Sequence, residues 1–327
     1  LYLGAFMCCT IILIIPGIIF LLFWAVTKND DKDETQYVEH HHHYEENKII
    51  NVDARDAALG GSASLVGGAS SVFVNPAGLA SATGLTISVG TFAWLVESNV
   101  THASFAMPLM GGTVGLFYYA LDYGDLNRTT WSSGANGGVS FDANSSSFTA
   151  IDAVMGAAFG KQLSDKFSIG GAAKMISENI DDYSISALAY DVGFQFATGY
   201  KNIQMGASIS NFGADVQDAD GVYDEFALPM NFDFGVTGQV FGDDAMGLIG
   251  GLNMAKFSDL GTEITLGGEF TVMGLAKLRG SYNLAENHTS PLGLGAGINV
   301  AGFSLDLCMT SFSDFDSVMR ISIGYSL

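Results

Sequence analysis

The second half of the chain alternates between apolar residues and polar or small residues with a period of two. From Phe303 to Thr310, Phe, Leu, Leu and Met occupy every second position, and Ser, Asp, Cys and Thr fall between them. Segments 262–272, 276–284 and 319–327 repeat the pattern. Because successive side chains of a β-strand point to opposite faces, this alternation predicts strands with one apolar and one polar face.

Fourteen strands of this kind are predicted in the region from residue 85 onward, and most are long. The predicted strands are 85–94, 101–108, 112–121, 147–160, 166–179, 183–198, 202–212, 226–241, 246–257, 261–273, 275–285, 291–300, 302–312 and 317–327. Soluble strands average about 5–6 residues, whereas a tilted strand needs about 9–11 residues to cross a bilayer. An even number of long strands therefore predicts an all-β protein, a closed antiparallel transmembrane barrel.

The connections between these strands alternate between short and long. Short turns are expected on the periplasmic side, near 109–111, 161–165, 199–201, 242–245, 274 and 301. Long extracellular loops are expected at 122–146, 213–225 and 286–290. On the last strand we expect Ile321 to face lipid and Ser322 to face the lumen, so that an arginine is tolerated better at Ser322.

Aromatic residues near the strand ends are expected to form two girdles at the membrane interfaces. One girdle would contain Trp94, Tyr118, Phe148, Tyr183, Phe212, Phe226, Phe257 and Phe312. The other would contain Phe159, Phe167, Phe196, Phe241, Phe303 and Tyr325.

Residues 1–26 carry no charge and include an apolar run from Ile11 to Trp24. As a helix they would be about 39 Å long, enough to cross a hydrocarbon layer of ~30 Å. Two interpretations remain open, a retained helix buried in membrane or in a partner, and the remnant of an export signal. We favour the retained helix because a basic n-region and an Ala-x-Ala site are both missing.

Residues 27–48 form an acidic linker that contains four consecutive histidines, His40, His41, His42 and His43. Imidazoles can bind Zn²⁺ or Cu²⁺, but consecutive side chains diverge, so a solvated spacer is favoured over a metal site. Asp218 and Asp220 lie in a second acidic segment that could bind Ca²⁺, although it lacks the EF-hand spacing. These six residues are the candidate metal ligands.

Residues 49–84 are predicted to fold into the lumen of the barrel 85–327 as a plug. They contain Gly60, Gly61 and the segment Asn75, Pro76, Ala77, Gly78, which favour turns and do not suit a lipid-facing strand. A fourteen-stranded barrel has a wide interior that something must fill. We expect Asn75 and Pro76 to fix a tight turn rather than to contact a ligand.

Composition narrows the class of function. The net charge of −21 would repel phosphate backbones, which excludes nucleic acid as a partner. Three cysteines are too few for a disulfide framework. The motifs G-x-S-x-G and H-E-x-x-H and the P-loop are all missing, so we expect neither enzymatic activity nor a cofactor.

Four charged residues fall on the inner faces of two adjacent predicted strands. They are Glu263, Glu269, Lys277 and Arg279. We expect these lumen charges to satisfy one another rather than to act as a general acid–base pair.

Two segments resemble a known family. Residues 51–61 read Asn-Val-Asp-Ala-Arg-Asp-Ala-Ala-Leu-Gly-Gly, and residues 71–80 read Ser-Val-Phe-Val-Asn-Pro-Ala-Gly-Leu-Ala. They resemble the N-terminal signature of the PorV/PorQ outer-membrane proteins, in the superfamily of the FadL-type long-chain fatty-acid transporter. Further similar segments are 92–95, 104–108, 121–130, 211–213 and 227–229. The resemblance covers about residues 50–327 and implies a fourteen-stranded barrel with an N-terminal hatch in its lumen.

The resemblance leaves three functions open. The first is a PorV-like role in type IX secretion, with protein partners at the extracellular loops or at the N-terminal helix. The second is FadL-like passage of a hydrophobic small molecule, and the third is a structural role in an envelope complex. The acidic loops and the segment 1–26 favour protein docking. Each function places the chain in the outer membrane of a diderm bacterium, in contact with its lipid.

Overall fold

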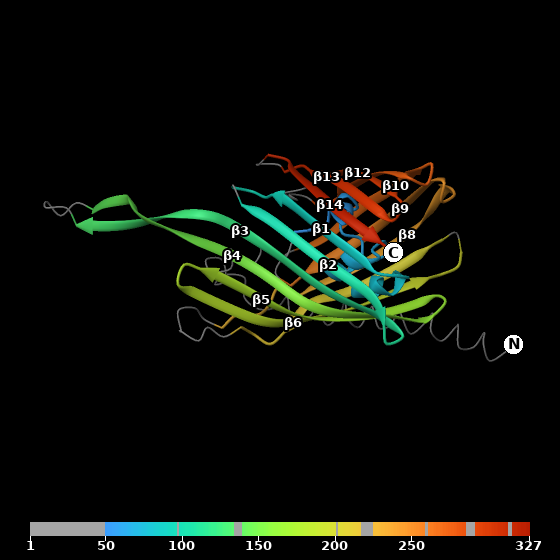
Figure 1. The fold of residues 1–327 in the computed structure, drawn as a ribbon, viewed down its shortest axis with the longest axis horizontal. Helices are drawn as coiled ribbons and strands as arrows, with labels where there is room; N and C mark the ends of the chain where they lie inside the picture. Colours follow the sequence, from blue (N-terminus) through green and yellow to red (C-terminus); the bar gives the residue numbers. More distant parts are fainter. Residues whose placement is uncertain are drawn as a thin grey trace. The chain divides into compact units, whose positions relative to one another are not determined.

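The computed structural model shows a closed barrel of fourteen strands in which sequence neighbours pair and β14 pairs with β1 (Figure 1). The structure describes residues 50–96, 98–133, 139–200, 202–216, 225–258, 261–285, 292–312 and 316–327. The predicted helix 1–26 and linker 27–48 lie outside these ranges. The strands are β1 Thr86–Ala93, β2 Asn99–Leu109, β3 Gly112–Ser133, β4 Val139–Ser164, β5 Phe167–Ile180, β6 Tyr183–Ala197, β7 Gln204–Gly213, β8 Asn231–Gly242, β9 Met246–Phe257, β10 Thr262–Val272, β11 Ala276–Asn283, β12 Leu292–Val300, β13 Phe303–Thr310 and β14 Val318–Ser326. All ladders are antiparallel, which confirms the predicted closed antiparallel barrel of fourteen strands.

At one end of the barrel, tight turns connect consecutive strands. Met110 and Gly111 both have positive φ, of 59° and 72°, as do Ala301 and Gly302, at 50° and 84°. Two positive φ angles are typical of the turns that fit the right-handed twist of a hairpin. We call this the short-turn end, and the opposite end, where 134–138, 214–230 and 284–291 connect strands, the long-loop end.

The prediction of an extracellular loop at 122–146 is wrong for most of these residues. β3 continues to Ser133 and β4 begins at Val139, so the two strands form a ribbon. β2 pairs with β3 only as far as Asp122, and β5 pairs with β4 only as far as Ala150, so the ribbon extends beyond its neighbours (Figure 1). The register of the β3–β4 ladder shifts at two places, between Asp122 and Asp125 and between Arg128 and Thr130. Such bulges let the ladder continue through glycine and asparagine residues, which weaken a strand.

The predicted start of the eighth strand, at residue 226, is also wrong. β8 begins at Asn231, and Phe226 only forms an isolated bridge with Val216. Pro229 follows that bridge, and proline has no N–H to donate to a ladder. The alternation of apolar and polar residues predicted a strand here, but Pro229 cannot continue the hydrogen-bonded ladder.

The outer wall of the barrel is apolar. On β14, the relative exposure is 67% for Met319 and 39% for Ile321, whereas it is 4% for Arg320 and 2% for Ser322. Closed barrels with an apolar outer surface and a polar inner face satisfy every backbone group without water, as a bilayer requires. The strands therefore present their apolar side to lipid.

Several predicted girdle residues face the interior, among them Phe257 of β9, which is only 6% exposed. Trp94 and Phe312 pack edge to face, with ring centroids 5.4 Å apart, and Trp94 lies against the buried guanidinium of Arg320. Both side chains therefore belong to the interior. Their positions near strand ends predicted an interfacial location, but these two residues lie in the connections, where the alternation no longer fixes the facing.

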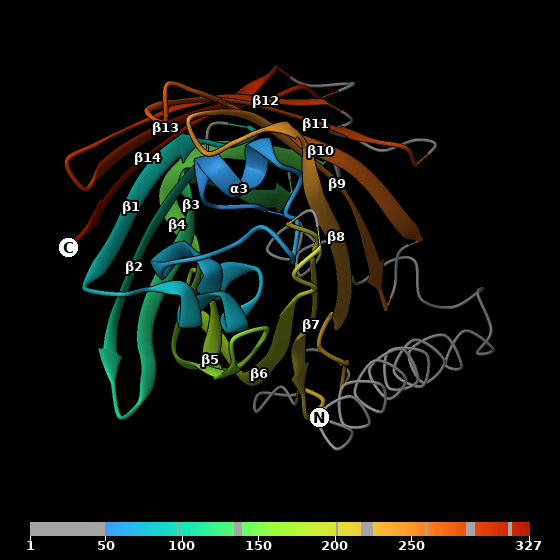
Figure 2. The same cartoon turned by 90° about the vertical axis from the view of Figure 1, so that its right-hand side faces the viewer.

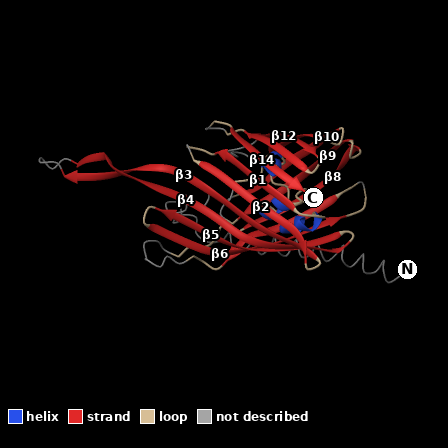
Figure 3. Ribbon diagram, viewed as in Figure 1, coloured by secondary structure: helices blue, strands red, loops and turns tan. Residues whose placement is uncertain are grey.

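Residues 50–84, the described residues that precede β1, lie inside the barrel (Figure 2). They form the helix α3 Ala54–Ala58 and the 3₁₀ helices η1 Ala69–Phe73 and η2 Pro76–Ser81, drawn in blue in Figure 3. α3 contacts β11 to β14, η1 contacts β1 to β3, and η2 contacts β3 to β6. We call residues 50–84 the inner segment. Across the described ranges, no helix combines the length and the apolar character that crossing a bilayer demands.

Candidate functional site

Glycines on the lumen face of the wall make room for the inner segment. A Cβ atom at Gly295 would lie 2.5 Å from Ala58 Cβ, and one at Gly267 would lie 2.7 Å from Leu59 O. At Gly206, Gly193 and Gly170 a Cβ would overlap Ala63, Asn75 and Pro76, respectively. A glycine inside a strand often marks the close approach of another backbone. These five glycines on β12, β10, β7, β6 and β5 thus form a track along which the inner segment lies.

α3 is fixed to the wall by its first residues. Asp53 caps the helix, and its Oδ1 accepts hydrogen bonds from Arg55 N at 2.9 Å and Asp56 N at 3.4 Å. Its Oδ2 accepts a hydrogen bond from Ser88 Oγ of β1 at 3.0 Å. Ala54 N donates to Ser322 Oγ of β14 at 2.9 Å. The helix is thereby held at the junction where the first and last strands close the barrel.

Asn75 holds the middle of the inner segment. Its Oδ1 accepts from Ala77 N at 3.0 Å, which caps η2. Its Nδ2 lies 2.9 Å from Ala63 O and 3.1 Å from Phe194 O of β6. Asn75 is completely buried. The predicted tight turn at Asn75-Pro76 is present as a helix cap, and the same side chain also ties the segment to the wall, which the sequence did not indicate.

Three of the four predicted lumen charges lie together. Glu269 of β10 accepts from Lys277 Nζ and from Arg279 Nε of β11, both at 2.7 Å. Arg279 also donates to Asp306 of β13 at 2.5 Å. The fourth, Glu263, lies further along β10 and accepts from Asn283 Nδ2 at 3.2 Å. Asp306 completes the network, and its place on the polar face of β13 was the available sequence indication.

Of the predicted turn residues, Gly60 and Gly61 follow α3 with φ of 70° each, and Gly61 N donates to Asp56 O at 2.9 Å. Pro76, Ala77 and Gly78 form the first turn of η2 and are buried. His40–His43, Asp218 and Asp220 lie outside the described residues. Within the described ranges, no group of three or more His, Cys, Asp or Glu side chains is arranged to hold a metal ion.

Asp56 is the most perturbed titratable group of the inner segment. Burial and the neighbouring carboxylate of Asp53 raise the pKa of Asp56 to about 7, against the opposing effect of Arg55 and Arg279. Its Oδ2 has no hydrogen-bond partner in the described part of the chain. Asp56 is therefore partly protonated near neutral pH.

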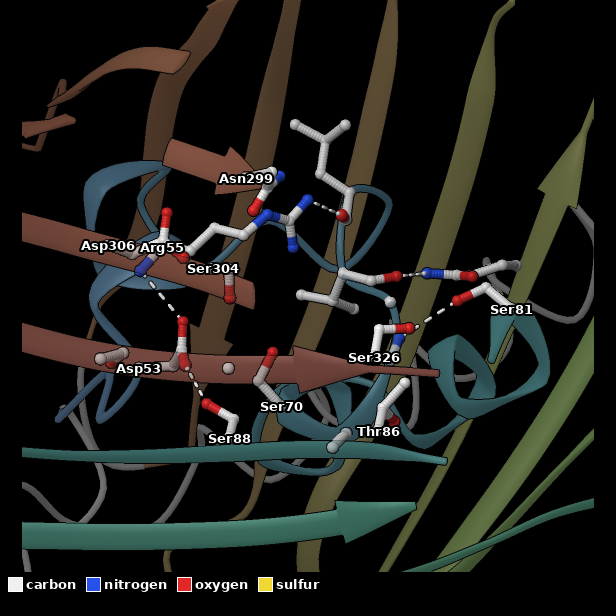
Figure 4. A pocket seen from close by; sticks show the side chains of 18 of the residues that line it. Asp53, Arg55, Ser70, Ser81, Thr86, Ser88, Asn299, Ser304, Asp306 and Ser326 are labelled. Carbon is white, nitrogen blue, oxygen red and sulfur yellow. Dashed lines mark hydrogen bonds between the residues drawn. The ribbon is translucent and has the colours of Figure 1, made fainter. Parts of the chain in front are cut away.

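A cavity of about 630 Å³ opens between the inner segment and the short-turn ends of the strands (Figure 4). Asp53, Arg55, Ser70, Ser81, Thr86, Ser88, Asn299, Ser304, Asp306 and Ser326 point into it or line it (Figure 4). Most of the residues that line the cavity carry hydroxyl, amide or charged groups. The cavity is thus a polar vestibule, and we use that name below.

The opposite side of the inner segment carries an apolar cluster. Its buried members are Val52, Phe92, Val100, Leu121 and Val318, and half-buried Ile50, Phe73, Trp94, Leu95, Tyr119, Tyr123 and Phe312 pack against them. They come from the inner segment, β1, β2, β3 and β14 and from the connections near them, toward the long-loop end. This lumen cluster was not predicted, because its members are spread over the whole chain.

No protein-family model and no curated protein sequence matches the chain. Solved structures do. The CymD monoaromatic hydrocarbon channel superposes with a TM-score of 0.58 at 12% identity, over 85% of this chain and 98% of that one. The Pseudomonas putida toluene transporter TodX gives 0.54 at 13% identity, over 83% and 96%. A Pseudomonas aeruginosa FadL homologue gives 0.51 at 10% identity, over 84% and 98%.

These similarities extend over nearly the full length of each of the three structures. At such low identity these similarities establish the fold alone. They do not establish that the chain belongs to the PorV/PorQ family. An apolar outer wall and a closed antiparallel barrel of fourteen strands require an outer membrane. The chain is an outer-membrane β-barrel with the fold of FadL-type channels.

Proposed function

We propose that the barrel passes a hydrophobic small molecule across the outer membrane, with the inner segment as the plug that restricts its lumen. The observation that carries this proposal is the lumen cluster. The interior of an aqueous porin is polar, whereas here aromatic and aliphatic side chains gather inside the barrel on one side of the inner segment. The similarity in fold to CymD, a monoaromatic hydrocarbon channel, and to TodX, a toluene transporter, supports the same class of cargo.

Uptake of N-phenyl-1-naphthylamine by intact diderm cells tests the proposal, because this hydrophobic dye fluoresces only after it has crossed the outer membrane. Cells that display the barrel should take up the dye faster than cells with an empty vector. Phe92→Asp places a charge in the lumen cluster and should abolish the gain. Ile323→Leu, on the lipid face of β14, should leave it unchanged.

Entry of nitrocefin, a polar β-lactam, serves as the control for leakage. If nitrocefin and the dye enter equally fast, the barrel is a nonspecific pore and the proposal is wrong. An equal dye signal from wild type and empty vector, at matched amounts of folded barrel, contradicts it as well.

A second function, docking of protein partners in the manner of PorV, is supported by the β3–β4 ribbon. Among the described residues, β3 pairs only with β4 between Asp125 and Ser133, and each outer edge of this ribbon offers backbone groups that could add a strand. Replacement of residues 123–149 by a short turn tests this function. Loss of a partner recovered by crosslinking, with dye uptake intact, would separate docking from transport.

A further inference from the structure

Arg320 is a buried cation inside the lumen cluster. The residue lies on β14 and is 4% exposed. Its guanidinium carbon lies 4.6 Å from the centroid of the Phe92 ring and 5.3 Å from that of Trp94. Such distances are those of cation–π contacts, which weakly stabilise a guanidinium in an apolar place.

The hydrogen bonds of Arg320 leave its charge uncompensated. Nη1 donates to Thr310 Oγ1 at 2.5 Å, and the Cys308 thiol is a second neutral partner. Nε has no partner in the described part of the chain. None of the ion pairs between described residues includes Arg320. A buried charge without a counter-charge destabilises a fold, so its presence calls for a cause other than stability.

Two other inward-facing cations among the described residues differ from Arg320 in this respect. Arg279 contacts Glu269 and Asp306, and Lys174 pairs with Asp191 at 2.8 Å. Each of these cations is already neutralised by the protein. Arg320 is therefore the group to which an anionic part of a ligand would bind.

We propose that the lumen cluster binds an aromatic carboxylate, with the carboxylate on Arg320 and the ring among the aromatic side chains. The inference rests on the proposed function and narrows it, because it assigns a charged group to the cargo. A guanidinium recognises a carboxylate through paired N–H donors, and the unpartnered Nε supplies one of them. Half-buried aromatic rings supply an apolar surface for the ring of the ligand.

Trp94 is the more accessible of the two aromatic side chains that contact Arg320. It contacts both the Arg320 guanidinium and the Phe312 ring and is only half-buried, whereas Arg320 is almost fully enclosed. Because Arg320 is so enclosed, the ligand has to displace a neighbour to reach it. We expect the Trp94 ring to move on binding, so that its fluorescence changes with the anionic ligand.

Binding of 4-fluorobenzoate and 4-fluorotoluene, measured by ¹⁹F NMR on the full chain in lipid nanodiscs, tests the proposal. The two probes share a fluorinated ring and differ in a carboxylate against a methyl group. Empty nanodiscs give the background partitioning. We expect the wild type to bind the benzoate at least about tenfold more tightly, as one charge-assisted hydrogen-bond pair provides.

Three variants make the test specific. Arg320→Met should remove the preference for the benzoate and leave binding of the toluene unchanged. Arg320→Lys keeps the charge without the planar fork and should keep part of the preference. Lys161→Met removes an exposed cation from β4 and should keep all of it.

Thermal unfolding separates binding from a structural role. Arg320→Met should unfold at the same temperature as the wild type or higher, because an uncompensated charge is removed. Equal binding of the two probes to the wild type overturns the proposal, and so does an unchanged preference in Arg320→Met. If dye uptake fails while the preference for the benzoate holds, the transport function is wrong and the binding site stands.

Discussion

The carboxamide of Asn75 fills the space that a Cβ atom on Gly193 would need. Asn75 belongs to the inner segment and Gly193 to β6, so the contact joins two parts of the chain that are far apart in sequence. The same carboxamide donates to Phe194 O, the next residue of the strand, at 3.1 Å. The absence of a side chain at Gly193 and the hydrogen bond from Asn75 to Phe194 O together hold the inner segment against β6.

Gly193→Ala should therefore displace the inner segment from β6. Hydrogen exchange of residues 63–80 should become faster, while the wall strands keep their protection. Gly171→Ala is the matched control on β5, because a Cβ there meets only Asp191 O at 3.5 Å, an ordinary contact. Equal exchange in the two variants would mean that the wall yields rather than the segment.

Gly295→Ala should loosen α3, because its Cβ would lie 2.5 Å from Ala58 Cβ. Cys308 packs under α3 with Ala54, Ala57 and Ala58 and is 3% exposed, so its reaction with a maleimide reports on the docking of the helix. The experiment uses a Cys8→Ser/Cys9→Ser background. We expect faster labelling in Gly295→Ala and no change in Gly280→Ala, where the nearest atoms would be 3.8 Å away.

Docking of α3 should weaken as the pH rises. Burial and Asp53 raise the pKa of Asp56 from 3.8 to about 7, so the docked helix binds more protons than the released helix between these values. Stability then falls with pH across that window and is constant above it. Protection factors for residues 54–61 should decrease from about pH 4 to about pH 7. Asp56→Asn should remove this dependence, and a persistent slope would assign it to another group.

Arg279→Met should destabilise the barrel strongly. The substitution leaves Glu269 and Asp306, which are 5% and 8% exposed, without their shared counter-charge. Loss of one partner from a buried network costs about 3–5 kcal/mol. Arg128→Met removes one half of the exposed pair with Asp181 and should cost less than about 1 kcal/mol. Urea unfolding in detergent measures both, and similar losses would show that the network is solvated.

Ile321→Arg should cost about 2–4 kcal/mol, because the side chain faces lipid near the middle of β14. The sequence suggested Ser322 as the tolerant neighbour, but Ser322 Oγ accepts from Ala54 N, so an arginine there would displace α3. Ser326 lines the vestibule and is exposed, which makes Ser326→Arg the better control. The fraction that resists unfolding by boiling detergent compares the variants. Equal losses at Ile321 and Ser326 would reverse the assigned facing.

The alternation of apolar and polar residues was sufficient to predict the barrel. Alternation with a period of two is a local property, since each residue's facing follows from that of its neighbour, and it placed Ile321 outside and Arg279 inside without knowledge of any contact. The alternation did not predict the side on which a side chain lies where the chain leaves a regular strand. Trp94 and Phe312 lie in connections, Pro229 ends a ladder, and the pairing of β3 with β4 outlasts the residues that weaken it.

The way in which the interior is filled depends on contacts that form only in the closed barrel. Gly193 and Asn75, or Gly295 and Ala58, are separated by more than a hundred residues, and their fit depends on the register of the whole barrel. The isolation of Arg320 among Phe92, Trp94 and Thr310 depends on how β14 closes against β1. A sequence pattern shows that a residue faces inward, but only the closed barrel shows which partner it meets there, because that partner comes from a different strand.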